Sequence, residues 1–400
     1  MKIAGIVAEY NPFHTGHAYQ VEQTRARLGE KCAVVAVMSG NWVQQAQCAI
    51  ADKWTRARLA LMGGVDLVLE LPTVWAASPA ESFARGAVGI LEACGVVDVL
   101  CFGSECGEIN GLERVAQCLD SEQYQVLIRQ LAVKGDTFAA ARQKAVSELM
   151  GQTAGELLGR PNNNLGVEYI RALHGLGSAI EPMTVLRRGA DHNTICKDRP
   201  SHLSATQIRE ELAHGRWESV ADYLHPDARR VLEDHLVIGG PERVERAILA
   251  RIRSMRAEDW AKLPESGQAE GLPQRLERVG RSCTGMEEFY ALAKTRRYTR
   301  ARLNRLVLWA WLGLTAEQVP AAPAYIRVLG FNGRGREVLH RMKQTAALPV
   351  LTKPAHARQL EKTGRELFEL EARCTDLYDL CVETIPAPGR EWNTDPVILP

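Results

Sequence analysis

The sequence predicts an α/β protein, with a parallel-sheet Rossmann domain over residues 1–224 and a mainly α-helical C-terminal domain over residues 225–400. In the first part, short continuous apolar runs alternate with helical segments, which is typical of strands buried on both faces of a parallel sheet. Beyond residue 225 the chain reads mostly as helix. Its 400 residues are enough for two separate cores.

Five strands are expected in the first domain, each an apolar run bounded by turn residues. They cover residues 1–7, 32–38, 65–69, 97–102 and 183–188. The helices between them have recognisable starts, since Asp52 can cap a helix that ends near Met62 and Ser78 can cap a helix over residues 79–93. Ligands of such sheets bind beyond the carboxyl ends of the strands. We therefore expect the loops after the first, second and fourth strands to meet at one crevice.

The first of these loops contains two histidines, His14 and His17, where the first strand gives way to a helix. The free N–H groups and the positive dipole end of a helix N-terminus attract phosphate. Gly16 leaves room for a ligand to approach the backbone, and two imidazoles can donate hydrogen bonds to phosphoryl oxygens. The alternative interpretation is a pair of surface histidines in a polar turn.

Three later segments contain further polar candidates. Residues 160–166 (RPNNNLG) are either a polar loop or a nucleotide contact. The fifth strand ends in two arginines, whose planar guanidinium groups suit phosphate. Residues 204–209 (SATQIR) predict a helix that Ser204 or Thr206 caps. That helix is either a well-capped structural helix or a second phosphate-binding N-terminus.

The second half contains a strongly basic stretch, residues 294–343, with eleven Lys or Arg residues against Glu317 and Glu337. In its helical part, Leu303, Leu306 and their apolar neighbours form one face, so the arginines should lie on the solvated side. Because the whole chain has a formal net charge of +1, a nucleic-acid site would have to be a local patch of this kind. The alternative is an ordinary solvated helix face.

The composition argues against several classes of protein. No apolar stretch approaches about 18 residues and no charged-then-apolar leader is present, so we expect neither a membrane span nor a signal peptide. The ten cysteines include no CxxC pair, which indicates reduced thiols in a cytoplasmic protein and no zinc site. We assign no metal ligand, and nothing in the sequence implies a protein partner.

The string EYNPFHTGH (residues 9–17) gives the histidine pair a more specific context. Its His-x-Gly-His part resembles the HxGH signature of the nucleotidyltransferase superfamily, and the longer string resembles the tRNA(Met) cytidine acetate ligase family of bacteria. The likeness extends along nearly the whole chain, through VMSGNWVQ, DKWTRARLAL, GVDLVLELP, FGSE, RPNN, LSATQIR, TRRYTRARLNR and RVLGFNGRGREVL. It implies an HxGH nucleotidyltransferase-like Rossmann domain that activates acetate with ATP, followed by a helical tRNA-binding domain.

The resemblance implies an ATP-dependent ligase that forms N4-acetylcytidine at the wobble position of elongator tRNA(Met). Acetate would attack the α-phosphorus of ATP to give acetyl-AMP, with Mg²⁺ as counter-charge, and the cytosine amine would then attack the acetyl group. No covalent acyl-enzyme is needed, so no cysteine is given a role. The partners implied are tRNA and acetate.

The family's functional residues carry over to the matching positions of this chain. The catalytic residues would be His14, His17 and Arg209. The ATP contacts would be Val7, Ala8, Glu9, Tyr10, Asn11, Pro12, Phe13, His14, Thr15, Gly16, His17, Ala18, Tyr19, Gln20, Gly103, Asn162 or Asn163, Arg187 or Arg188, Ser204 and Thr206. From the basic stretch we expect tRNA contacts at Arg296, Arg297, Arg300, Arg334 and Arg336.

One departure from the family's pattern lies in the loop after the second strand. The family usually reads Val-Gln-Arg-Gly-Glu-Pro there, and residues 43–48 of this chain have Gln45 in place of the arginine. If that arginine binds phosphate, this chain either binds ATP more weakly or uses Lys53 or Arg56 instead. Two other functions stay open, namely a nucleotidyltransferase that adenylylates a small-molecule acceptor and a non-catalytic RNA-binding protein.

Overall fold

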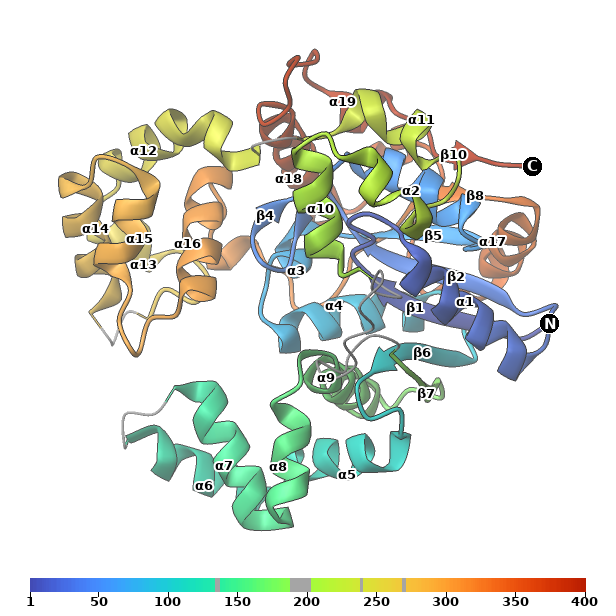
Figure 1. Ribbon diagram of the computed structural model, residues 1–400, viewed down its shortest axis with the longest axis horizontal. Helices are drawn as coiled ribbons and strands as arrows, with labels where there is room; N and C mark the ends of the chain where they lie inside the picture. Colours follow the sequence, from blue (N-terminus) through green and yellow to red (C-terminus); the bar gives the residue numbers. More distant parts are fainter. Residues whose placement is uncertain (134–136, 188–202, 238–239, 268–270) are drawn as a thin grey trace.

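The computed structural model describes residues 1–133, 137–187, 203–237, 240–267 and 271–400. Figure 1 shows a central sheet with helices on both faces and two groups of helices that extend away from it. We call these groups the α5–α8 lobe (residues 109–158) and the α12–α16 lobe (residues 245–312).

In the described part of the chain, the central sheet has eight strands, in the order β10-β8-β5-β2-β1-β6-β7, with β9 paired to β8. All neighbouring strands are parallel except β5 and β8. A separate antiparallel hairpin, β3–β4, follows β2. The strand bounds are β1 Ile3–Ala8, β2 Ala33–Ser39, β3 Trp42–Val43, β4 Gln47–Cys48, β5 Leu67–Leu71, β6 Val99–Ser104, β7 Glu181–Leu186, β8 Ile326–Phe331, β9 Val350–Leu351 and β10 Val397–Ile398.

The helices fall into four groups. Those packed on the sheet are α1 Thr15–Leu28, α2 Lys53–Met62, α3 Thr73–Ala76, α4 Ala80–Ala93, α9 Pro161–Leu176, α10 Ala205–Ala213 and α11 Ala228–Leu232. The α5–α8 lobe contains α5 Ile109–Asp120, α6 Glu122–Val133, α7 Phe138–Met150 and α8 Gln152–Leu158. The α12–α16 lobe contains α12 Glu245–Ser254, α13 Ala257–Ala261, α14 Leu272–Ser282, α15 Met286–Ala293 and α16 Arg300–Leu312. The C-terminal helices are α17 Gly333–Thr345, α18 Lys362–Asp379 and α19 Arg390–Asn393.

Short 3₁₀ helices connect some of these elements. They are Trp217–Ser219, Ala221–Tyr223, Glu233–His235, Gly240–Val244, Ala316–Gln318 and Pro354–Gln359.

Strand β2 shows why the sheet lies in the middle of the molecule. All of its residues are buried, and successive side chains enter cores on opposite faces. Val35 and Val37 pack in the larger core with residues of α3, α4 and α9, whereas Val34 and Met38 pack in the smaller core with residues of α1, α2 and α10. A strand buried on both faces needs apolar residues at every position, which is the pattern that predicted it.

The five predicted strands are confirmed, each within two residues of its expected bounds. Asp52 caps α2 as expected, through a hydrogen bond from the backbone N–H of Thr55 at 2.9 Å. The prediction that Ser78 caps the next helix is wrong, because Pro79 occupies the cap position and the Ser78 hydroxyl donates to the carbonyl of Trp75 at 2.6 Å. That hydroxyl closes the preceding turn of α3 instead.

The C-terminal part of the chain differs from the expectation of a separate, mainly helical domain. Strands β8, β9 and β10 come from residues 326–398, and β8 lies beside β5 in the central sheet. Helix α17 also packs on β2 and β5. Within the described C-terminal part, the helical lobe is therefore confined to residues 245–312. The strands of residues 326–398 and helix α17 belong to the Rossmann core. The six-residue run of β8 lies inside the basic stretch, where its apolar pattern was overlooked.

Candidate active site

The two predicted histidines lie side by side at the start of α1. His14 precedes the helix, and its Nδ1 accepts a hydrogen bond from the backbone N–H of Gly16 at 3.0 Å. His17 lies in the first turn, and its Nδ1 accepts from the backbone N–H of His14 at 3.2 Å. Since Nδ1 is an acceptor in both rings, each neutral imidazole carries its proton on Nε2. One helix N-terminus thus holds two imidazoles in the same tautomer.

The surroundings of His17 favour its uncharged form. The ring centroids of His14 and His17 are 3.9 Å apart, and His17 also packs against the rings of Tyr10 and Phe13. Burial, followed by the nearby His14 and Arg187, lowers the pKa of His17 well below its ordinary value of 6.5. His17 is therefore a neutral hydrogen-bond donor at physiological pH.

Gly16 has a packing role that the sequence analysis did not foresee. A Cβ at this position would lie 2.7 Å from Cε1 of His14. The imidazole folds back over the glycine to reach its N–H, so a side chain there would displace the ring. The expectation that Gly16 also leaves room for a ligand stays a prediction.

The loops after β1 and β2 are joined by the fully buried Arg56 of α2. Its guanidinium donates to the carbonyl oxygens of Glu9 at 2.6 Å, Ser39 at 3.0 Å and Ala51 at 2.9 Å, and also to that of Gly40. Four carbonyls from three segments are thus fixed by one side chain. The loops after the first two strands therefore meet as predicted, and Arg56 holds them in position.

Neither Lys53 nor Arg56 can replace the arginine that is missing from the loop after β2. Lys53 is fully buried, and its Nζ lies 2.5 Å from a carboxylate oxygen of each of Glu70 and Glu391. Gln45 itself is exposed at the tip of the β3–β4 hairpin. The hypothesis that either cation takes over a phosphate contact is therefore wrong, because both are committed to buried partners.

The second predicted phosphate-binding element lies next to the histidine loop. Arg209 of α10 donates to the backbone oxygen of Asn11 at 2.9 Å and to Oγ1 of Thr206 at 3.1 Å. Ser204 caps this helix as predicted, and its Oγ accepts from the backbone N–H of Gln207 at 3.2 Å. Burial lowers the pKa of Arg209, which still lies so high that the guanidinium stays charged. A positive charge therefore faces the loop that leads to the histidines.

Glu105, in the loop after β6, is tied to the start of α9. Its carboxylate accepts hydrogen bonds from N and Nδ2 of Asn162 and from N of Asn163, at 2.7–3.1 Å. In return, Oδ1 of Asn163 accepts from the backbone N–H of Glu105 at 2.9 Å. The asparagines thus form the first turn of a helix instead of a polar loop. Gly103 lies in β6 two residues before Glu105, and a Cβ there would lie 3.1 Å from Cγ of Arg187.

The remaining predicted ATP contacts are distributed along the same crevice. Val7 and Ala8 end β1, and the segment from Thr15 to Gln20 belongs to α1. Arg188 lies outside the described residues. Contact between each of these residues and ATP stays a prediction.

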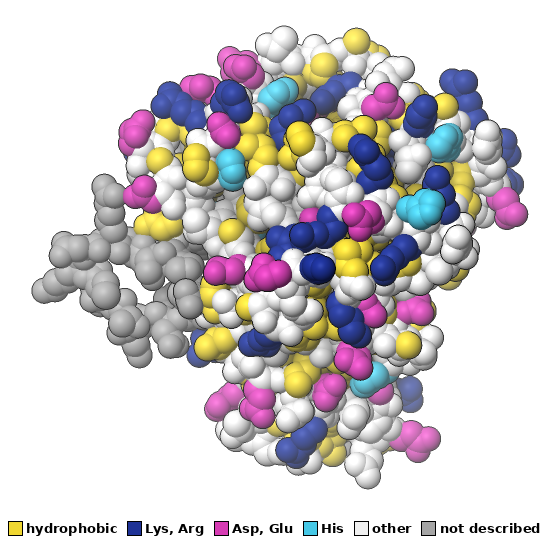
Figure 2. All heavy atoms as spheres, turned by 90° about the vertical axis from the view of Figure 1, so that its right-hand side faces the viewer, with side chains coloured by type: hydrophobic (Ala, Val, Ile, Leu, Met, Phe, Trp, Pro, Cys, Tyr) yellow, Lys and Arg dark blue, Asp and Glu magenta, His cyan; other side chains and the backbone are white. Residues whose placement is uncertain are grey.

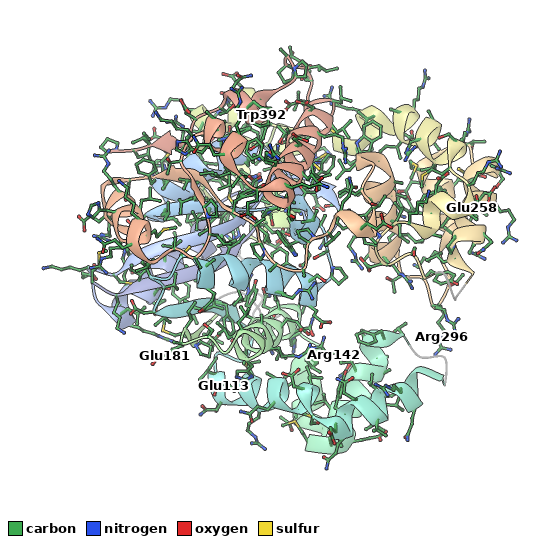
Figure 3. The ribbon with its side chains drawn as sticks, turned by 180° about the vertical axis from the view of Figure 1, so that it is seen from behind. Glu113, Arg142, Glu181, Glu258, Arg296 and Trp392 are labelled. Carbon is green, nitrogen blue, oxygen red and sulfur yellow. The ribbon has the colours of Figure 1, made fainter. Side chains whose placement is uncertain are left out.

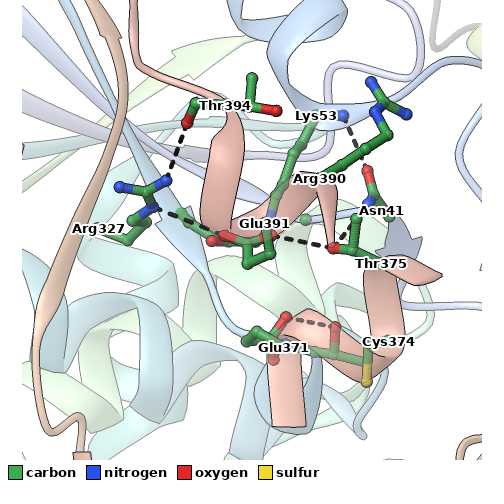
Figure 4. Close-up of polar contacts among 12 residues, drawn as sticks. Asn41, Lys53, Arg327, Glu371, Cys374, Thr375, Arg390, Glu391 and Thr394 are labelled. Atoms are coloured by element: carbon green, nitrogen blue, oxygen red, sulfur yellow. Dashed lines mark hydrogen bonds and ion pairs between the residues drawn. The ribbon is translucent and has the colours of Figure 1, made fainter. Parts of the chain in front are cut away.

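A second group of polar residues was missed by the sequence analysis. Lys53, Arg327, Glu70, Glu371 and Glu391 form a buried charge cluster between α2, the sheet and helices α18 and α19 (Figure 4). Burial, and then the neighbouring Glu70, raise the pKa of Glu371 to about 8. With Glu371 protonated, two cations face two carboxylates and the charges balance. The members are scattered between residues 53 and 391, so no motif could have revealed them.

The basic stretch does not form one surface. Arg300 donates to both carboxylate oxygens of Glu287. Arg305 donates to both carboxylate oxygens of Glu265, and Arg302 donates to the backbone oxygen of the same residue. Arg327, counted with the others in the sequence analysis, belongs to the buried charge cluster. The expectation of a single one-sign patch is therefore wrong, because carboxylates from elsewhere in the chain neutralise several of its members.

The other basic residues lie in two separate places. Arg296 and Arg297 are exposed in the α12–α16 lobe, and Figure 3 shows Arg296 at the edge that faces the α5–α8 lobe. Arg334 and Arg336 belong to α17 on the far side of the sheet (Figure 1), where Arg334 donates to the carbonyl of Cys32 at 3.2 Å. On the molecular face at that side, basic and acidic side chains are interspersed (Figure 2). Contacts of these residues with tRNA stay predictions.

Two further findings on the described residues concern metal ions and membranes. Among them, no group of three or more His, Cys, Asp or Glu side chains is placed to hold a metal ion. No helix built from them combines the length and the apolar character that crossing a bilayer requires.

Comparisons with known proteins agree with this geometry. A family model for the HIGH nucleotidyl transferases matches residues 1–390. A tRNA(Met) cytidine acetate ligase of Syntrophomonas wolfei subsp. wolfei is 35% identical over 99% of both chains, and one of Caldanaerobacter subterraneus subsp. tengcongensis is 36% identical over 95% of both. The crystal structure of Thermotoga maritima TmcAL bound with alpha-thio ATP is 33% identical and covers 100% of both chains, with a TM-score of 0.90.

These likenesses span the chain from end to end and confirm the predicted fold class. The chain therefore belongs to the tRNA(Met) cytidine acetate ligase family of HIGH nucleotidyltransferases.

Proposed function

We propose that the chain is an ATP-dependent ligase that forms N4-acetylcytidine at the wobble position of elongator tRNA(Met), through acetyl-AMP. The observation that carries this proposal is the meeting of two phosphate-binding elements, because Arg209 of α10 binds the loop that positions His14 and His17. Membership of the family over the full length supports it, as does the ATP analogue bound by the T. maritima relative. A tRNA substrate would place the protein in the cytoplasm.

In the first half-reaction, a carboxylate oxygen of acetate attacks the α-phosphorus of ATP and the bond to the pyrophosphate oxygen breaks. Negative charge builds up on the phosphoryl oxygens during this step. The Nε2–H groups of His14 and His17 and the positive end of α1 are suited to stabilise that charge. Arg209 neutralises the departing pyrophosphate. With Nδ1 occupied by a backbone N–H in both rings, Nε2 is the nitrogen that can donate to the phosphoryl oxygens.

Mg²⁺ is expected to accompany ATP, as in other phosphoryl-transfer enzymes. Because the described residues offer no group of three ligating side chains, the phosphates of the nucleotide would supply most of its ligands. We therefore assign the ion neither protein ligands nor a separate step.

We assign tRNA binding first to Arg296 and Arg297, because both are exposed in the α12–α16 lobe and Arg296 lies at its edge (Figure 3). Arg300 contributes less, since Glu287 already neutralises it. Replacing Arg296 and Arg297 by Ala should weaken tRNA binding and reduce its salt dependence by about 0.7–0.9 log units per lost contact. The pair Arg334→Ala and Arg336→Ala is the matched comparison for the other side of the sheet. Normal binding by both double variants would contradict the assignment.

Nucleoside mass spectrometry tests the proposed function directly. Elongator tRNA(Met) is incubated with the protein, ATP and isotopically labelled acetate, then digested to nucleosides. The label should appear in N4-acetylcytidine and should require ATP. Acetyl-CoA without ATP should not replace acetate, and activity with acetyl-CoA alone would overturn the proposal.

The same experiment separates the two other functions. An enzyme that adenylylates a small-molecule acceptor would consume ATP without labelling tRNA. A non-catalytic RNA-binding protein would bind tRNA and neither consume ATP nor transfer label. No specific observation in the structure favours either of them over the ligase.

A further inference from the structure

A carboxylate lies in the candidate active site without a role in the chemistry described so far. Glu9 follows the last residue of β1 and directly precedes the loop that leads to His14. Its Oε1 accepts a hydrogen bond from the backbone N–H of Gln44 at 2.9 Å, and its backbone oxygen accepts from Arg56. The side chain is therefore fixed between the loop after β1 and the β3–β4 hairpin. Among the described residues, nothing donates a hydrogen bond to Oε2.

The carboxylate of Glu9 does not suit contact with ATP phosphates, which repel it, so the ATP contact predicted for this residue would be with another part of the nucleotide. The carboxylate does suit contact with a group that must lose a proton. In the second half-reaction, the cytosine amine becomes an acylated amide and one of its two protons has to leave. The neighbouring groups are less suited to accept it. The acceptor nitrogens of His14 and His17 are already bonded to backbone N–H groups, and Arg209 cannot accept a proton.

We propose that Glu9 is the general base that accepts the proton from N4 of cytosine during acetyl transfer. The N4 lone pair forms the C–N bond to the carbonyl carbon of acetyl-AMP, and the bond from that carbon to the phosphate oxygen breaks. The electron pair of the broken bond leaves with AMP, and the N4 proton passes to Oε2 of Glu9. This inference rests on the proposed function and adds to it a residue for its second step.

The groups around Glu9 fit this role. Arg209 from α10 and Arg56 from α2 place positive charge nearby, and the phenol of Tyr169 comes from α9. Burial is the largest influence on Glu9 and raises its pKa above the ordinary value of 4.5. A carboxylate with a raised pKa is a stronger base, and general bases work best when their pKa approaches the operating pH. The hydrogen bond from the Gln44 N–H and the two arginines oppose the effect of burial on this pKa.

The substitution Glu9→Gln separates a base from a structural acceptor. A Gln side chain can still accept the hydrogen bond from the Gln44 N–H, but it cannot take up a proton. Two rates are measured with the full-length protein, namely acetate-dependent exchange of labelled pyrophosphate into ATP without tRNA, and acetyl transfer from preformed acetyl-AMP to saturating elongator tRNA(Met). Thermal melting of the variant confirms that it is folded.

The matched control is Glu105→Gln, which removes a carboxylate charge from the loop after β6 at the same edge of the sheet. Both oxygens of Glu105 are bonded to the start of α9, so no base function is assigned to it. Glu105→Gln should affect the two half-reactions to a similar extent. A selective effect on transfer in the Glu9 variant is then attributable to the lost proton acceptor and not to the lost charge.

We expect Glu9→Gln to reduce acetyl transfer by about 10²–10⁴-fold and to reduce pyrophosphate exchange at least tenfold less. Transfer at the unsubstituted rate would overturn the inference, because Glu9 would then serve only as an acceptor for Gln44. Equal losses in exchange and transfer would also overturn it, because Glu9 would then act in acetate activation. A failure of the proposed function would give a different result, because the unsubstituted protein would then form no acetylcytidine.

Discussion

The histidine site and the buried charge cluster lie at the same edge of the sheet and are built in opposite ways. His14 and His17 are three residues apart, and backbone N–H groups of the same turn fix both rings. The five members of the cluster come from α2, β5, β8, α18 and α19, and their charges are balanced by side chains far away in the sequence. Polar residues at one edge of the sheet thus form the proposed catalytic site in one region and hold the C-terminal helices in the other.

The two regions are linked by the loop after β2. Asn41 Oδ1 accepts from the backbone N–H of Lys53 at 2.9 Å, and its Nδ2 donates to Thr375 of α18 at 3.2 Å. On the other side, the neighbouring Gly40 is held by Arg56, which also binds Glu9. Substitutions in the cluster should therefore lower the free energy of unfolding, whereas substitutions of the histidines should lower the reaction rate.

The largest expected effect is on stability, from Lys53→Met. This substitution leaves Glu70 and Glu391 buried without their shared cation, and breaking a buried ion pair in this way typically costs about 3–5 kcal/mol. The free energy of unfolding in urea measures the loss. Lys31→Met is the matched control, because Lys31 is exposed and its loss should change stability by less than about 0.5 kcal/mol. Equal effects of the two substitutions would show that the cluster is not a stability element.

The next effect is on rate, from His17→Ala. Losing one donor to a transition-state oxyanion typically costs about 10²–10³ in rate, so acetate-dependent pyrophosphate exchange should fall by that factor. The melting temperature should fall only modestly, because the substitution removes one hydrogen bond at the start of α1 and a half-buried ring. His174→Ala is the control, because His174 is exposed at the end of α9. If His17→Ala lowers stability while each folded molecule keeps its exchange rate, the histidine is a packing residue.

A smaller effect concerns the pH dependence of stability through Glu371. Its pKa is raised from 4.5 to about 8 in the folded protein, so the folded state binds this proton more tightly than the unfolded chain. The resulting stability is fully present below about pH 4.5 and is lost as the pH rises through about 8. One such proton changes the unfolding free energy by up to about 1.4 kcal/mol per pH unit. Glu371→Gln, which stays neutral, should show a flatter curve over that window, and an identical curve would contradict the protonated state.

The smallest effect concerns the hairpin between the two regions. Ala46 adopts φ +58°, a left-handed conformation that a Cβ disfavours. Ala46→Gly should therefore raise the unfolding free energy by about 0.5–1 kcal/mol, whereas Ala46→Val should lower it. Thermal melting of the two variants measures both changes. A destabilised Ala46→Gly protein would mean that the turn is not held in this conformation.

The sequence was sufficient for most features with a local signal, the cap predicted at Ser78 being an exception. The apolar runs of β1 and β2 are continuous, Asp52 and Ser204 precede their helices at capping distance, and the histidine pair follows a strand directly. Each of these features involves residues a few positions apart. Local patterning therefore predicted the core of the fold and the place where phosphate should bind.

The sequence was insufficient wherever partners are far apart. Strand β8 pairs with β5 across more than half of the chain, and no turn signal connects them. Lys53 and Arg327 are cations like any others in the sequence, and only their distant carboxylates make them core residues. The same limit explains the basic stretch, since periodicity does not reveal that Glu265 and Glu287 neutralise its arginines.

The most direct test of the central claim follows oxygen atoms from acetate. Acetate labelled with ¹⁸O in both carboxylate oxygens is incubated with the protein, ATP and elongator tRNA(Met). The masses of the AMP, pyrophosphate and acetylcytidine formed are then measured by mass spectrometry. If acetate attacks the α-phosphorus at the histidine site, one labelled oxygen stays on phosphorus when the acyl bond breaks. The account predicts AMP with one ¹⁸O, unlabelled pyrophosphate, and acetylcytidine with the other ¹⁸O. Label in phosphate or pyrophosphate, or AMP without label, would contradict it.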